Sequence, residues 1–203
     1  MTMSVKRCAD MALSSLALLV LSPVLAIIAL AVRVDSGSPI LFSQERVGLR
    51  FRRFQILKFR TMRVHSAGRL VTVAGDDRIT RVGRVLRRTK LDELPQLWNV
   101  LRGEMSVVGP RPEVPEYVDL FRERYRAVLT VPPGMTDLAS IQFRNEEELL
   151  SKSADPIKDY TERVLPAKLE SAERYVDKHS ICGDIAILFR TGAALVKGRT
   201  PPG

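Results

Sequence analysis

The 203 residues of this chain are enough for one domain with a hydrophobic core, or for one domain and a membrane segment. The net charge of +9 is concentrated between residues 33 and 111, where 17 Lys and Arg oppose seven Asp and Glu. This basic block favours a polyanionic partner, such as nucleic acid, an anionic membrane surface or a phosphorylated small molecule, whereas two isolated cysteines exclude a disulfide framework.

An apolar segment without charge covers residues 11–32. As a helix it would extend about 33 Å, which is enough to span a bilayer. A secretory signal is the alternative, but the segment is long for one and is followed by Arg33 rather than a small-residue cleavage site. Because Lys6 and Arg7 precede the segment and further arginines follow it, the positive-inside rule gives no direction for a crossing.

Ser22 and Pro23 lie at the middle of this segment. Pro23 cannot donate a hydrogen bond to the carbonyl of Leu19, so we expect the helix to bend or break there. The hydroxyl of Ser22 is placed to bond back to the carbonyl of Leu18 and to offset part of this loss. A broken helix that enters and leaves on the cytoplasmic side would satisfy both basic flanks, whereas a kinked single span is the other interpretation.

The following residues predict a small β-hairpin and then a basic helix. Apolar and polar side chains alternate around Gly48 within residues 38–62, which indicates two short strands. Residues 63–77 are expected to form a loop. Residues 78–90 place apolar side chains on one helical face and arginines on the other, as in a helix that lies in a membrane interface. A surface helix packed on a soluble core is the alternative.

The remainder of the chain predicts mostly helices. The proline-rich residues 107–118 are expected to be irregular, and residues 131–146 to form a loop with some strand character. Helices are expected at residues 116–129 and 159–179. Residues 181–198 are apolar, and their length and two glycines favour an interfacial or packed helix over a membrane span.

Asp92 and Glu93 form the candidate site. Apolar side chains recur at helical spacing from residue 91 to residue 101, and Pro95 fits only in a first turn, so we expect a helix to start near Asp92. The helix dipole and the preceding Arg87, Arg88 and Lys90 favour the ionised carboxylates. The structural alternative is that Asp92 caps the helix and Glu93 merely occupies its first turn.

The surrounding residues favour phosphate chemistry. An ionised carboxylate pair beside guanidinium groups can hold Mg²⁺, which would carry a diphosphate. Arg111 lies between two prolines that fix the backbone, which suits a bidentate phosphate clamp, although a surface ion pair is the alternative. Lys58 and Arg60 are further candidate phosphate partners. A carboxylate can also attack phosphorus and form an acyl phosphate.

At these residues the sequence resembles the bacterial sugar transferases, the small monotopic phosphoglycosyl transferases. The resemblance rests on the apolar segment with Ser22 and Pro23 and on the stretches "FRTM", "LDELPQLWNVLRGEMSVVGPRP" and "PPGMTD". It implies a mainly α fold with a small β-hairpin, a broken re-entrant membrane helix at residues 1–35 and interfacial amphipathic helices. A catalytic domain at residues 36–203 would then lie on the cytoplasmic face of the bacterial inner membrane.

The same resemblance implies the reaction. A sugar-1-phosphate would pass from a UDP-sugar to undecaprenyl phosphate, with UMP released and Mg²⁺ required, in the first membrane step of a surface-glycan pathway. Asp92 would be the nucleophile that forms a covalent phosphosugar intermediate. Glu93 would be its partner in metal binding or proton handling, and Arg87 and Arg111 would hold phosphates. Anionic membrane lipids are expected as further partners.

One departure from the family pattern concerns the loop after Gly134. Asp137 and Leu138 stand where many members have glycine and tryptophan, so the identity of the sugar does not carry over if this loop contacts it. The alternative function is that of a non-enzymatic membrane-anchored protein that binds anionic lipid or nucleic acid. Against nucleic acid, the basic block lacks a recognition helix, an RNA-binding aromatic pair and a zinc knuckle.

Overall fold

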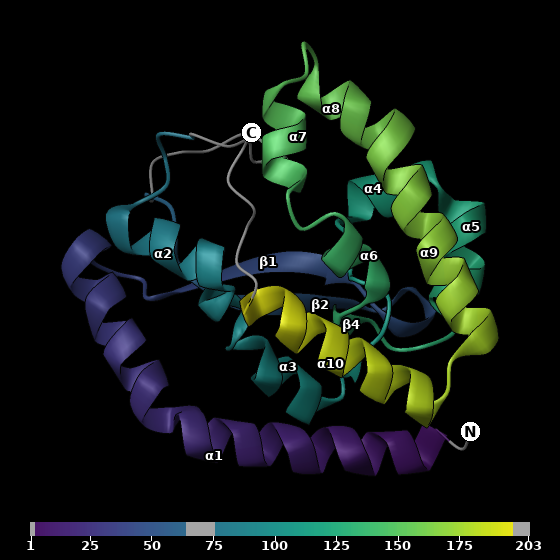
Figure 1. The fold of residues 1–203 in the computed structure, drawn as a ribbon, viewed down its shortest axis with the longest axis horizontal. Coiled ribbons are helices and arrows are strands. Elements are labelled where there is room, and N and C mark those ends of the chain that lie inside the picture. The colour runs from purple at the N-terminus through teal and green to yellow at the C-terminus, as the bar shows by residue number, and fades with distance from the viewer. Residues whose placement is uncertain (1–2, 64–75, 197–203) are drawn as a thin grey trace.

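The computed structural model describes residues 3–63 and 76–196, most of which are helical (Figure 1). The expected β-hairpin is present: β1 (Leu41–Val47) and β2 (Arg53–Phe59) pair antiparallel, and Gly48 and a 3₁₀ turn connect them. Only β2 buries a set of large side chains in the core, at Phe54, Ile56 and Phe59. The mainly α fold with one small hairpin is therefore confirmed.

A second, parallel sheet was not predicted. The strands β3 (Ser106–Val108) and β4 (Gly134–Thr136) pair in parallel, with Ser106 opposite Gly134 and Val108 opposite Thr136. β3 corrects the expectation that residues 107–118 are irregular throughout. A three-residue strand is too short to give a readable alternation, and its partner lies far along the chain.

The remaining helices follow the sequence expectations with shifted boundaries. They are α2 (Arg81–Thr89), α3 (Gln96–Arg102), α4 (Pro115–Leu120), α5 (Arg122–Val128), α6 (Leu138–Gln142), α7 (Glu146–Ser151), α8 (Pro156–Asp159), α9 (Leu165–Lys178) and α10 (Ile181–Val196). The helix expected at residues 116–129 is divided at Phe121, and the one at 159–179 begins with a π-helical turn, Tyr160–Val164. The loop expected at residues 63–77 falls mostly outside the described residues.

Three clusters of buried side chains form the core. The largest lies among α4, α5 and α9, and a second joins β2, α3, β3 and α10. The third packs the C-terminal part of α1 against β2 and α2 through Ile28, Val32, Phe59 and Leu86. The apolar face expected for residues 78–90 is buried only in part, because Leu86 is buried and Val85 is exposed.

The apolar segment lies in one long helix, α1 (Met3–Ser36), which is long and apolar enough to cross a membrane. The helix is bent but not interrupted, which corrects the expected break at Ser22 and Pro23 (Figure 1). The Ser22 hydroxyl donates to the carbonyl of Leu19 at 2.8 Å, not to that of Leu18. Because Leu19 is the residue whose carbonyl loses its backbone donor at Pro23, the hydroxyl replaces the missing bond and the helix continues.

Both ends of α1 are attached to the rest of the protein by polar contacts. Near its N-terminus, Lys6 pairs with Asp184 of α10, and Arg7 donates to the carbonyls at the end of α3. Buried Asp10 accepts hydrogen bonds from the Ser106 hydroxyl at 2.7 Å and from the backbone N–H of Val107 at 3.2 Å. At the other end, Asp35 contacts α2, and Ser36 contacts Arg60, which directly follows β2. The two ends of the apolar helix therefore lie against the same folded body.

Candidate functional site

Asp92 and Glu93 lie in a 3₁₀ turn, Leu91–Glu93, between α2 and α3. Lys90, with a φ of 60°, ends α2 in the left-handed conformation and redirects the chain. α3 begins only at Gln96, so the helix expected from Asp92 starts later. Neither the turn nor α3 has a side-chain cap, and the capping explanation for Asp92 is therefore wrong.

Glu93 is the centre of a cluster of cations that come from distant parts of the chain. Lys58 of β2 donates to Oε1 at 3.0 Å. Arg111, from the loop after β3, spans the carboxylate, with Nη1 at 3.1 Å from Oε2 and Nη2 bonded to Oε1. The Nζ of Lys90 lies 4.0 Å from Oε1. The structure thus brings together three of the predicted site residues, Lys58, Glu93 and Arg111.

The ionisation of this cluster follows from its contacts. Burial would raise the pKa of Glu93, but the charges of Arg111, Lys58 and Lys90 hold it well below its ordinary value. The carboxylate of Glu93 in turn raises the pKa of Arg111. Burial lowers the pKa of Lys58 despite the neighbouring Glu93. Glu93 is therefore an ionised carboxylate with both oxygens engaged.

Asp92 has the opposite environment. Its side chain is only 6% exposed, and its Oδ1 is buried without a hydrogen-bond partner in the described part of the chain. Burial raises its pKa, and the negative charge of Glu93 raises it further, against the effects of Lys58, Lys90 and Arg87. The sequence expectation of a favoured ionised form is wrong in direction, because burial outweighs the cations. Asp92 is the carboxylate of the pair that has an oxygen free for chemistry.

All six predicted catalytic and substrate-binding residues line one cavity of about 1180 Å³: Lys58, Arg60, Arg87, Asp92, Glu93 and Arg111. Arg87 pairs with Glu147 of α7, and its buried Nε has no hydrogen-bond partner among the described residues. Arg60 is bound to the end of α1. Ser22 and Pro23 lie in α1 and do not line the cavity. The cavity thus combines a cationic wall with the carboxylate of Asp92, whose Oδ1 accepts no hydrogen bond from the described residues.

Two carboxylates to which sequence reasoning assigned no structural role, Asp137 and Asp10, hold this arrangement. Buried Asp137 accepts the backbone N–H of Arg111 at 3.2 Å and caps α6 through the N–H of Ser140 at 2.6 Å. In the sequence, the capping role of Asp137 could have been found from its position directly before a short helical segment. Asp10 fixes β3, which leads into the loop that carries Arg111. In the sequence, Asp10 could have been found as the single acidic residue at the edge of the apolar segment.

The carboxylate oxygens of Asp92 and Glu93 differ in whether they are available to a Mg²⁺ ion. No group of three or more His, Cys, Asp or Glu side chains that could hold a metal occurs within residues 3–63 and 76–196. Both oxygens of Glu93 accept hydrogen bonds, whereas Oδ1 of Asp92 accepts none from the described residues. Mg²⁺ is commonly held by one or two carboxylates and by substrate phosphates. Of the two carboxylates expected to bind Mg²⁺, Glu93 has both oxygens engaged, so an ion that arrived with a diphosphate would take Asp92 as its protein ligand.

Comparison with known proteins gives a consistent assignment. The family model described as "Bacterial sugar transferase" matches residues 1–198. The UDP-glucose:undecaprenyl-phosphate glucose-1-phosphate transferase of Escherichia coli is 40% identical over 192 residues, which are 92% of this chain and 39% of that protein. The protein of the same name from Caulobacter vibrioides is 39% identical over 197 residues, 94% of this chain and 69% of that protein.

A third relative has nearly the same extent as this chain. The exopolysaccharide production protein PSS of Rhizobium leguminosarum is 38% identical over 205 residues, which cover 94% of each chain. By contrast, the chain spans well under half of the Escherichia coli relative. The part of this chain that matches the family model, residues 1–198, includes all the site residues described above.

Proposed function

Because this chain belongs to the bacterial sugar transferase family, we propose that it transfers a sugar-1-phosphate from a UDP-sugar to undecaprenyl phosphate and releases UMP. The names of two relatives support both the nucleotide-sugar donor and the lipid acceptor. The observation that carries the proposal is the environment of Asp92. It is a buried carboxylate with a free oxygen, beside a cationic cluster and in a large cavity.

In the first step, an oxygen of Asp92 attacks the sugar-bearing phosphorus of the UDP-sugar. The bond from this phosphorus to the oxygen that bridges to UMP breaks, and UMP leaves with the electron pair. The product is an acyl phosphate in which the phosphosugar is bound to Asp92. The raised pKa of Asp92 reflects a poorly solvated carboxylate, and poor solvation favours attack once the group is ionised.

In the second step, a phosphate oxygen of undecaprenyl phosphate attacks the same phosphorus. The acyl–phosphate bond breaks, the carboxylate of Asp92 is restored, and the product is a lipid diphosphate that carries the sugar. Two successive displacements at one phosphorus allow UMP to form before the lipid binds. The kinetics are therefore expected to be ping-pong.

The cations around Glu93 have a positioning role in this mechanism. Glu93 holds Lys58 and Arg111 at the cavity wall, where their charges oppose the negative charge of the diphosphate and of the leaving UMP. Arg87, whose Nε lacks a described partner, supplies a further phosphate donor. Mg²⁺, when bound at Asp92, would offset the repulsion between this carboxylate and the diphosphate.

The attachment of α1 supports a re-entrant topology. Its first turns contact α3, β3 and α10, and its last turn contacts α2 and Arg60, the residue after β2. A helix whose two ends bind one folded body cannot cross the bilayer completely. We therefore place α1 as a bent helix that enters and leaves the inner membrane on its cytoplasmic face, with the catalytic part on the same side.

The decisive experiment maps the intermediate. Purified wild type, Asp92→Asn and Glu93→Gln are incubated with a sugar-labelled UDP-sugar and Mg²⁺ without lipid, and any adduct is located by mass spectrometry. Wild type should release UMP and carry the phosphosugar on Asp92. Asp92→Asn should fold but form no adduct, and Glu93→Gln should be severely impaired because Lys58 and Arg111 lose their anchor.

The other outcomes separate the alternatives. An adduct on Glu93, or full turnover in Asp92→Asn, would overturn the assignment of the nucleophile. Ternary-complex kinetics without any adduct would instead favour direct attack by the lipid phosphate. If no UDP-sugar in a panel supports UMP release with undecaprenyl phosphate and Mg²⁺, the protein is a non-enzymatic lipid-binding member of the family.

A further inference from the structure

We propose that the lipid acceptor binds with its prenyl chain in the groove between α1 and α2 and with its phosphate on Arg60. The inference rests on the proposed function, since it assigns a site to the acceptor of that reaction. Three observations carry it: the groove, the incomplete bonding of Arg60, and the last turn of α1, which contributes to both.

The groove is a separate hollow of about 540 Å³ outside the main cavity, a size typical of ligand pockets. One wall is the C-terminal half of α1, with Ile27, Leu30 and Val34, and the other is the start of α2, with Val82. Ile27 and Leu30 are exposed, so the lining is apolar and unfilled by the protein. If α1 lies in the membrane, a groove along its surface can receive a hydrocarbon chain, and the chain does not have to leave the bilayer.

Arg60 is a buried cation with unused donors. It is 5% exposed, and its Nη2 donates to the backbone carbonyl of Ser36 at 2.5 Å and to the Ser36 hydroxyl at 3.0 Å. Its Nε and Nη1 are buried without a hydrogen-bond partner in the described part of the chain, and the residue lines the main cavity. A buried guanidinium group is costly unless its N–H groups are paired. A phosphate whose oxygens accept hydrogen bonds from these unpaired N–H groups would complete it.

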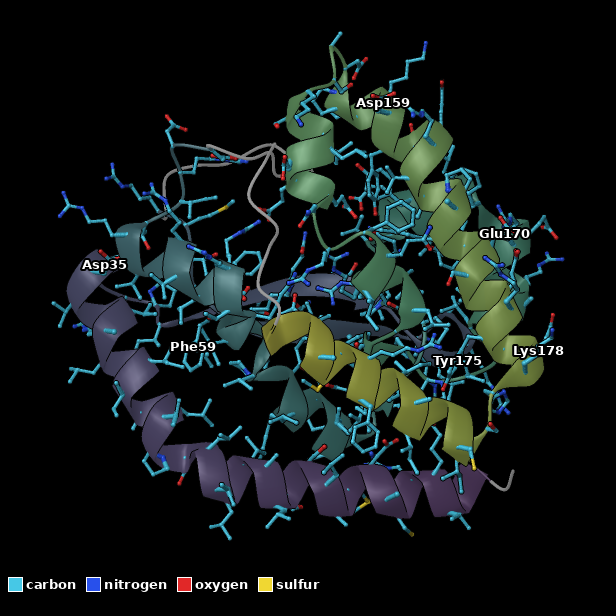
Figure 2. All side chains as sticks on the ribbon, in the orientation of Figure 1. Asp35, Phe59, Asp159, Glu170, Tyr175 and Lys178 are labelled. Atoms are coloured by element: carbon cyan, nitrogen blue, oxygen red, sulfur yellow. The ribbon has the colours of Figure 1, made fainter. Side chains whose placement is uncertain are left out.

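The groove and Arg60 meet at the last turn of α1. Val34 and Asp35 line the groove, and Ser36, the next residue, binds Arg60. Asp35 lies where this end of α1 approaches α2 (Figure 2), and it accepts the backbone N–H of Val82 at 3.1 Å. The last turn of α1 therefore carries residues of the groove and the partner of Arg60, and the proposal places the phosphate of the lipid at this turn.

Asp35 and Arg81 are the charged residues that line this groove, and the carboxylate of Asp35 accepts the backbone N–H of Val82. Arg81 lines the groove itself, and its side chain is exposed at the start of α2. Arg78, Arg87 and Arg88 line the main cavity on the other side of α2. A lipid phosphate that moves from the groove into the cavity would thus pass from one set of arginines to the next.

This placement separates the two substrates. The donor diphosphate is assigned to the cations around Glu93, whereas Arg60 is bound to α1, which is the membrane-embedded element. Only the acceptor has a hydrocarbon chain that needs an apolar groove. Filling the groove should therefore affect the acceptor and leave the donor unaffected.

The first test fills the groove with a larger apolar side chain. Ile27→Trp and Leu30→Trp should raise the KM for undecaprenyl phosphate about tenfold, because bulky rings displace part of the prenyl chain. The KM for the UDP-sugar and the UMP released without lipid should stay at wild-type values. Leu16→Trp and Leu19→Trp are matched controls, since both positions are exposed on α1 and outside the groove. Equal KM values in groove and control variants would overturn the inference.

The second test does not depend on turnover. Wild-type protein in vesicles is photolabelled with a prenyl phosphate that carries a diazirine on its chain, and labelled peptides are mapped by mass spectrometry. Label at residues 27–34, competed by undecaprenyl phosphate and reduced in Arg60→Lys, supports the site, because a lysine ammonium replaces the several separate N–H donors of Arg60 with one point charge. Label elsewhere, or equal competition by phosphatidylglycerol, means that the groove holds bulk lipid and contradicts it.

The two proposals fail in distinguishable ways. A wild-type protein that releases no UMP with any UDP-sugar contradicts the proposed function, whatever the photolabel shows. A wild-type protein that turns over normally, together with unaffected groove variants, contradicts only the acceptor site.

Discussion

Replacing Arg111 with lysine is expected to lower activity strongly although the charge is kept. The guanidinium group of Arg111 spans both oxygens of Glu93, with Nη1 3.1 Å from Oε2 and Nη2 bonded to Oε1. Lysine offers one point charge and cannot make both bonds. Losing one charged hydrogen bond costs about 1.5–3 kcal/mol, and each 1.36 kcal/mol is a factor of ten in rate, so kcat/KM should fall about 10- to 150-fold.

The assay measures kcat and KM for the UDP-sugar separately, with UMP release as the readout. The loss should appear in kcat as well as in KM, because the fixed cations oppose charge that develops on the leaving UMP. Arg126→Lys is the matched control, since Arg126 forms an exposed ion pair with Glu123 on α5, away from the cavity. Thermal unfolding should show that both variants fold. Wild-type values of kcat/KM in Arg111→Lys would show that the two hydrogen bonds from Arg111 to Glu93 have no role in catalysis.

Three further predictions concern pH, stability and topology. Burial raises the pKa of Asp92 above the ordinary value of 3.8, so UMP release without lipid should be lost on acidification with a midpoint above pH 3.8. A midpoint at or below pH 3.8 would contradict the raised pKa. Asp10→Ala should destabilise the protein by about 1–3 kcal/mol, because it leaves the buried N–H of Val107 without an acceptor. Asp10→Asn keeps an acceptor and should lose less stability. Thermal unfolding in detergent measures both. Single cysteines in a cysteine-free background, Thr2→Cys and Arg50→Cys, should both be protected from an impermeant reagent outside the cell. Labelling of position 2 from the periplasm would exclude the re-entrant topology.

The ionisation of Glu93 also links the site to stability. Its folded pKa is held below the ordinary value, so its ion pairs stabilise the protein at pH values above that ordinary value, and the stabilisation is lost as the pH falls through the lowered pKa. The pKa shift of Asp92, and therefore its effect on stability, has the opposite sign. Its folded pKa is raised, so its ionisation costs stability once the pH rises above the ordinary value of 3.8. The pair therefore places one stabilising and one destabilising carboxylate side by side.

The sequence by itself determined the local features of the protein. The uncharged segment within residues 11–32 required an apolar helix, and Pro23 required a local loss of helical hydrogen bonding, because both effects depend only on nearby residues. The alternation around Gly48 gave the hairpin for the same reason. The family motifs also identified the two carboxylates and the basic residues that line the cavity with them.

Only the tertiary structure decided what each of these groups does. Lys58 and Arg111 are 35 and 18 residues from Glu93 in sequence, yet both bind it. The local cations before Asp92 predicted an easily ionised carboxylate, but its burial reverses the direction of the pKa shift. The attachment of both ends of α1, and the parallel pairing of β3 and β4, likewise need segments far apart in the chain to meet. Burial and long-range pairing set the local dielectric and the available partners, and no local pattern contains them.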